Sequence, residues 1–172
     1  MRKAQINIIL VVLLIIIFGG LALFLLSFAR TISQDEYMHM YAHNLLLSIL
    51  RTDTGYTDIQ CKLVSDVTRC GFFQTEYRCG KSGPNCLTIA NESINEYISR
   101  FRDIRKNFRY LFTVEPVGFV ARSSTGEPLK ISIGDSTLKT AKISKWAASE
   151  EIRKITATGE YRLRAQLIIA LK

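Results

Sequence analysis

Several catalytic signatures are missing from this chain of 172 residues. It has no Gly-x-Ser-x-Gly nucleophile motif, no glycine-rich phosphate-binding loop and no dinucleotide-binding fingerprint. It contains only two histidines, and its four cysteines form no Cys-x-x-Cys pair. The sequence therefore predicts neither an enzyme nor a cofactor, and an enzyme ranks third among the functional hypotheses.

Charge is missing from residues 6–28, where Asn7 and Ser27 are the only polar side chains. A helix of this length spans about 30 Å of hydrocarbon, and a soluble-core helix would not need to be apolar on every face. The sequence predicts a short cytoplasmic leader over residues 1–5 and a transmembrane helix over residues 6–29. A cleaved secretory signal is the alternative, because Ser27-Phe28-Ala29 offers a weak cleavage site, although the apolar run is longer than such signals need.

The flanking charges predict the orientation of this helix. Arg2 and Lys3 precede it, whereas Arg30 and then Asp35 and Glu36 follow it. Positive charge is retained on the cytoplasmic side, so we expect a single-pass protein with a cytoplasmic N-terminus and an extracytoplasmic C-terminal domain. The net charge of +8 suits an anionic surface nearby but is not by itself a nucleic-acid signature.

The helical pattern continues beyond the apolar run, because residues 31–52 contain neither glycine nor proline. Apolar residues recur there at steps of three and four, which predicts one continuous helix over residues 7–51 with an extension over residues 30–52. Glu36, His39 and His43 lie on one side of this helix and could approach a metal ion together. They also read as a polar stripe, and we expect no metal.

The four cysteines follow in one stretch, as Cys61, Cys70, Cys79 and Cys86. An even number in a small exported domain predicts two disulfides, whereas zinc would favour Cys-x-x-Cys pairs or a nearby histidine. A helix predicted over residues 58–68 would separate Cys61 from Cys70 by about 13 Å, too far for a disulfide. Two connectivities remain, and the nested one, Cys61–Cys86 around Cys70–Cys79, is preferred.

The remainder, residues 53–172, is predicted to be an α+β domain. A helix over residues 88–107 precedes strands over residues 110–114, 117–122, 129–133 and 161–171, which would form an antiparallel sheet. Residues 138–155 fit a helix or a strand. Asn91 begins the only glycosylation sequon. The predicted helix also carries a basic face that reads either as a solvated surface or as a binding surface, made of Arg100, Arg102, Arg105 and Lys106.

The N-terminus resembles the class III signal peptide of archaeal type IV pilin-like proteins. Arg2-Lys3-Ala4-Gln5 forms a short basic leader in front of the apolar helix, and a sheet-rich domain after a long helix is similar to the pilin plan. The resemblance implies cleavage between Ala4 and Gln5, with Lys3 as the preceding basic residue. Two positions differ from the commoner family pattern: Ala4 replaces a glycine, and Ile9 replaces a glutamate.

This resemblance implies a structural, pilin-like or pseudopilin subunit of an archaeal surface filament or a related envelope assembly. The expected partners are membrane lipid and other copies of the chain or other pilin-like subunits, with no specific nucleic acid and no small-molecule substrate. The alternative is a membrane-anchored surface domain whose basic face binds a protein or an envelope glycan.

Overall fold

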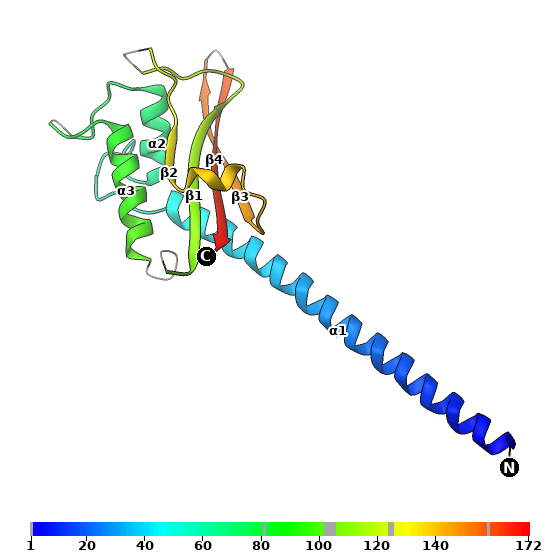
Figure 1. The fold of residues 1–172 in the computed structure, drawn as a ribbon. Coiled ribbons are helices and arrows are strands. Elements are labelled where there is room, and N and C mark those ends of the chain that lie inside the picture. Colours follow the sequence, from blue (N-terminus) through cyan, green and yellow to red (C-terminus); the bar gives the residue numbers. More distant parts are fainter. Residues whose placement is uncertain (1, 81, 102–105, 124–125, 158) are drawn as a thin grey trace. The chain divides into compact units, whose positions relative to one another are not determined.

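A computed structural model of the chain describes all residues except 1, 81, 102–105, 124–125 and 158, and omits the side chains of residues 2–11 and 28–33. The chain divides into two compact units, residues 1–38 and residues 39–172. The second unit has the α+β composition that the sequence predicts (Figure 1).

One uninterrupted helix, α1 (Arg2–Leu50), forms the N-terminal third, as the helical pattern over residues 7–51 predicts. The predicted transmembrane helix is wrong: in the described part of the chain, no helix is both long and apolar enough to cross a membrane. The same finding contradicts the predicted single-pass location, with its cytoplasmic N-terminus and extracytoplasmic domain.

Two shorter helices follow, α2 (Val64–Phe73) and α3 (Cys86–Arg100). The helix predicted over residues 58–68 begins too early, because the Asp58 side chain accepts a hydrogen bond from the Gln60 N–H in a local turn and α2 starts only after Leu63. Asn85 caps α3 by accepting a hydrogen bond from the Thr88 N–H at 2.8 Å. α3 ends at Arg100, earlier than the predicted residue 107.

Four antiparallel strands form one sheet in the order β2-β1-β4-β3. These strands are β1 (Phe108–Val117), β2 (Ile131–Gly134), β3 (Trp146–Thr156) and β4 (Gly159–Leu171). β1 tolerates Pro116 because β2 pairs only with Leu111–Val114, so the proline lies where one edge of β1 has no ladder. The strand predicted over residues 117–122 is absent from the described chain, which has there only a single bridge between Arg122 and Pro128.

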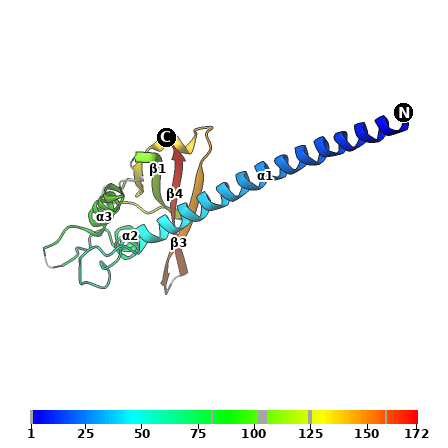
Figure 2. The same cartoon turned by 90° about the horizontal axis from the view of Figure 1, so that it is seen from below.

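The helices cover one face of this sheet. On α1, Tyr41 stacks on Phe108 of β1 at 5.7 Å, and His43 Nε2 lies 3.7 Å from Glu150 Oε1 of β3. Since β4 lies between β1 and β3, the last turns of α1 cross the sheet (Figure 2). They bury Leu46 and Ile49 completely. α2 and α3 pack side by side next to these turns (Figure 1).

A short 3₁₀ helix, η1 (Ser136–Lys139), covers part of the other face. Its Leu138 is fully buried and packs with Leu111, Ile168 and Ala170. Asp135 accepts hydrogen bonds from the Thr137 N–H and from the Arg109 guanidinium, which holds η1 against β1. The end of β4 is therefore buried on both faces. Residues 138–155, for which the sequence fits a helix or a strand, divide between η1, a connection and β3.

Leu138→Ala tests the role of η1. Removing this buried side chain is expected to lower the free energy of unfolding by about 2–5 kcal/mol. Urea unfolding followed by Trp146 fluorescence would measure it. Ile143→Ala, at a residue of the following connection that is 41% exposed, should cost less than about 0.5 kcal/mol. Equal effects of the two substitutions would contradict the packing described for η1.

Candidate functional site

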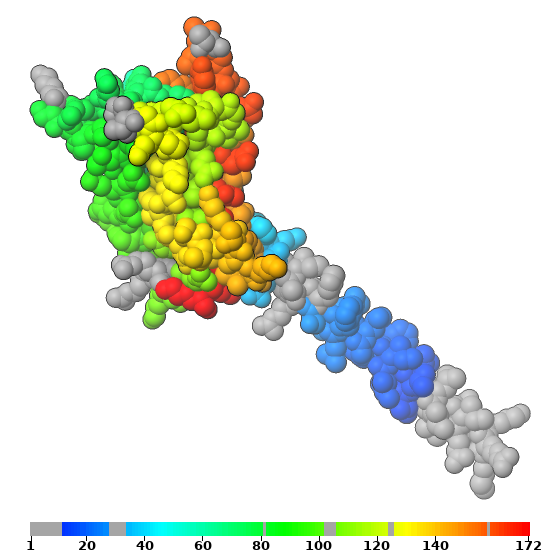
Figure 3. All heavy atoms as spheres, turned by 45° about the horizontal axis from the view of Figure 1, so that its top comes forward, coloured from blue at the N-terminus to red at the C-terminus, as the bar shows by residue number. Residues whose placement is uncertain are grey.

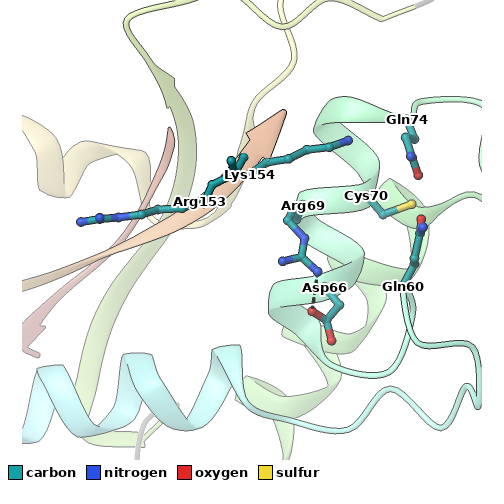
Figure 4. Close-up of a pocket in the computed structure, with 8 residues that line it drawn as sticks. Gln60, Asp66, Arg69, Cys70, Gln74, Arg153 and Lys154 are labelled. Atoms are coloured by element: carbon teal, nitrogen blue, oxygen red, sulfur yellow. Dashed lines mark hydrogen bonds and ion pairs between the residues drawn. The ribbon is translucent and has the colours of Figure 1, made fainter. Parts of the chain in front are cut away.

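A surface pocket of about 420 Å³ lies between α2 and β3 in the second unit. Gln60 borders it from the loop before α2, Arg69 and Cys70 from α2, and Gln74 from the end of that helix (Figure 4). Lys154 and Ile155 enter from β3. The helical layer and one strand of the sheet thus build the pocket together.

The cations of the pocket differ in their partners. Arg69 donates a hydrogen bond to Asp66 at 3.1 Å, which balances its charge. Lys154 extends from β3 toward Gln74 and holds its ammonium 5.1 Å from the centre of the Phe73 ring (Figure 4). Among the ion pairs of the described residues, none includes Lys154. Its positive charge therefore dominates the pocket and favours an anionic group there.

Arg153 also borders the pocket but points away from it, in the direction opposite to Lys154 (Figure 4). On the outer face of the β3–β4 hairpin it lies 3.1 Å from Glu151 and 3.6 Å from Glu160. Arg162 lies close to the same two carboxylates. These charges compensate one another outside the pocket, so Arg153 adds little to the potential inside it.

The sulfurs of all four cysteines form two disulfides, Cys61–Cys79 and Cys70–Cys86. The predicted nested pairing is wrong, whereas the pairing of Cys61 with Cys70, which the sequence argued against, does not occur. The separation of about 13 Å expected for these two residues assumes one regular helix between them, but Cys61 precedes α2 and only Cys70 lies on it. The two bridges touch, because Cys79 Sγ and Cys86 Sγ lie 3.7 Å apart.

A polar contact also connects the loop before α2 with the loop that leads to Cys79. The Tyr77 hydroxyl donates a hydrogen bond to Asp58 Oδ2 at 2.5 Å. This bond, together with one from the Gln60 N–H, holds the pKa of Asp58 below its ordinary value of 3.8. The same bond raises the pKa of Tyr77 above 10.0. The turn before α2 is thus fastened to the loop before Cys79.

Two residues of the predicted basic face, Arg100 and Lys106, lie among the described residues. Arg100 ends α3, where its guanidinium pairs with Glu96, and Lys106 is exposed. Arg102 and Arg105 lie outside the described residues. Asn91 is half-buried on α3.

Among the described residues, the only acidic, histidine or cysteine group close enough to hold a metal ion consists of Cys61, Cys79 and Cys86, so Glu36, His39 and His43 form none. Lys3, Ala4 and Gln5 begin α1, but their side chains lie outside the description.

Sequence reasoning missed the pocket and its Lys154. Arg69 and Lys154 are 85 positions apart in the sequence, and neither belongs to a motif. Alternation along residues 146–156 could have shown that Lys154 shares a face with the buried Ile152, which is an unusual position for a lysine in a strand. Comparison with protein-family models, with curated proteins and with solved structures finds no match for this chain.

The bond between Tyr77 and Asp58 predicts a defined pH dependence of stability. Because the pKa of Asp58 is lowered, its contribution is present above about 3.8 and is lost as the pH falls through the folded-state value. Because the pKa of Tyr77 is raised, its contribution is present below about 10.0 and is lost as the pH rises through the folded-state value. Tyr77→Phe should therefore lower the Tm by a few degrees between these limits.

Thermal unfolding at a series of pH values would measure this difference. The gap between the Tm of the native chain and that of Tyr77→Phe is expected to shrink in acid and in alkali. Tyr97→Phe is the control, because that ring packs on Phe101 at 4.8 Å and the substitution leaves the bond between Tyr77 and Asp58 intact. A gap for Tyr77→Phe that is constant at every pH would contradict the proposed coupling.

Proposed function

We propose that the chain is a pilin-like structural subunit of an archaeal surface filament or a related envelope assembly. It would associate with other copies, or with other pilin-like subunits, through the apolar part of α1. One observation carries the proposal. The large apolar side chains between Val12 and Leu26 are 43–71% exposed, so their own chain leaves them largely uncovered.

Burial of this surface supplies the driving force for association. Fully burying one leucine, isoleucine, valine or phenylalanine side chain contributes about 1.5–3 kcal/mol. The exposed residues surround the helix rather than forming one stripe, since consecutive positions from Val12 to Phe18 are all exposed. A helix that is apolar on every side is covered best by several neighbours, as in a bundle.

Gly19 and Gly20 support close packing of such helices. Apart from the adjoining backbone of α1 and the two chain neighbours, no atom lies within 4 Å of the position that a Cβ would occupy at either glycine. Small residues let the backbones of neighbouring helices approach each other, which strengthens dispersion contacts. The apolar segment thus combines large side chains that need cover with a site where a second helix fits closely.

The second unit suits the exterior of such an assembly. It has its own core and two disulfides. Each bridge closes a loop of similar length, and removing a native disulfide from a small domain typically costs about 2–5 kcal/mol. The exposed apolar side chains from Val12 to Leu26 are not part of this core, so they are available for contacts with other subunits.

Charged substitutions in α1 test the proposal. Ile16→Glu with Leu23→Glu should abolish assembly of the purified full chain, because bundling would bury two carboxylates among apolar side chains. Sedimentation after removal of detergent, with electron microscopy of the pellet, would measure the result. The native chain is expected to form filaments of uniform diameter.

Ile59→Glu with Ile155→Glu is the matched control. These two isoleucines are 82% and 85% exposed in the second unit. Ile155 pairs with Glu160 close to the β3–β4 turn, and this hairpin projects from the second unit (Figure 3). This variant should assemble like the native chain. Amorphous material from the native chain, or filaments from the α1 variant, would refute the proposal.

Processing of the leader is a separate prediction from the resemblance. Coexpression with a prepilin-type peptidase should give a chain that begins at Gln5, as shown by intact mass and N-terminal sequencing. Ala4→Leu should block the cut, because the peptidase takes a small residue at that position in the family that the chain resembles. Ala22→Leu, within the apolar segment, should be processed normally. If the native chain stays uncut, the resemblance to class III signal peptides no longer supports the proposed function.

A further inference from the structure

We infer that the Cys70–Cys86 disulfide exchanges with small anionic thiols that enter the cationic pocket between α2 and β3. The substrate class is a thiol that carries carboxylates, and the product is a mixed disulfide on Cys70. This activity is independent of filament assembly, because every group involved lies in the second unit.

Cys70 is the cysteine that an incoming thiol can reach most easily. It borders the pocket and is 5% exposed, whereas the other three are at most 1% exposed. Its sulfur lies between the side-chain ends of Gln60 and Gln74 (Figure 4). A thiol that enters the pocket therefore meets this sulfur before any other.

The positive charge of the pocket favours thiols that carry negative charge. The Lys154 ammonium is the cation without an acidic partner among the described ion pairs, since Asp66 balances Arg69. A positive charge favours the thiolate, which is the form that attacks a disulfide, and it attracts carboxylates of the same molecule. The amides of Gln60 and Gln74 can donate hydrogen bonds to those carboxylates. An anionic thiol should thus be concentrated beside Cys70.

The leaving sulfur is also well placed. Cys86 is the first residue of α3, directly after the cap Asn85. The N-terminus of a helix stabilises a thiolate, and a more stable thiolate leaves faster. The incoming thiolate forms a bond to Cys70 Sγ as the Cys70–Cys86 bond breaks, and the electron pair stays on Cys86 Sγ. The incoming sulfur is oxidised and Cys86 is reduced, so no other oxidant is needed.

The second disulfide can then take part. The Cys86 thiolate lies beside Cys79, whose Sγ is 3.7 Å away in the closed form. Attack on Cys79 forms a Cys79–Cys86 bond, breaks Cys61–Cys79 and leaves the electron pair on Cys61. One incoming thiol would in this way rearrange both bridges that fasten the helical layer.

Timed reactions of the oxidised, purified full chain would test the inference, with glutathione as the anionic thiol and cysteamine as the cationic one. Acid quenching, intact mass and peptide mapping would give the rate and the modified residue. We expect a glutathione adduct on Cys70. Lys154→Glu should slow that adduct about tenfold and speed the cysteamine adduct, an effect that added salt reduces. Lys154→Gln, which removes the charge without reversing it, should give an intermediate rate.

Arg153→Glu is the matched control, because this neighbouring cation points out of the pocket. It should change either rate by about twofold or less, since its charge is compensated outside. Adducts on a different cysteine, equal rates for both thiols after correction for thiolate fraction, or equal effects of the Lys154 and Arg153 variants would overturn the inference. A Cys79–Cys86 peptide in the same digests is expected, and its absence would overturn the second exchange.

Discussion

The pairing of β4 along both of its edges is the constraint on which the second unit depends. β4 pairs with β1 from Arg162 to Leu171 and with β3 from Gly159 to Ile169. These two ladders fix which residues of β1 and β3 face the helices. They place Phe112 and Leu167 directly opposite each other in the core. The last turns of α1 and the 3₁₀ helix η1 can cover the two faces only because this central strand is apolar on both sides near its end.

The two disulfides join the helices and loops of the helical layer. α2 and α3 are short, and isolated helices of that length are marginal in water. Cys70 joins α2 to the start of α3 through Cys86, and Cys61 joins the loop before α2 to Cys79. The contact between Asp58 and Tyr77 adds a polar link between the same loops. The layer is therefore held by covalent and polar links at the points where the chain turns.

The packing of the helical layer against β3 also creates the cationic pocket. Because the end of α2 approaches β3, Lys154 from the sheet lines the same pocket as Cys70, and its ammonium lies over the Phe73 ring. A stabilising disulfide thus borders a cationic pocket, which is a different role from that of the apolar segment of α1. Assembly and disulfide exchange would use separate units of the chain, so either can be altered without the other.

The sequence by itself determined the long helix, the last strand and the α+β class of the second unit. Periodicity over residues 31–52 and alternation over residues 161–171 are local signals, and each element is long enough for its period to be plain. The sequence also determined that four cysteines would pair. It misplaced the start of α2, because an aspartate that closes a turn has the same local pattern as a helix cap. It also predicted a membrane span that the described residues do not provide.

Only the tertiary structure decided which cysteines pair and which polar groups surround them. Connectivity depends on how the loop before α2 meets the start of α3, and no local pattern encodes that approach. The pocket depends on side chains that are distant in sequence, such as Arg69 and Lys154. Their meeting follows from the packing of α2 against β3, which is set by the register of the whole sheet. Local elements are fixed by short-range propensity and periodicity, whereas a site built from several elements exists only after long-range packing has brought them together.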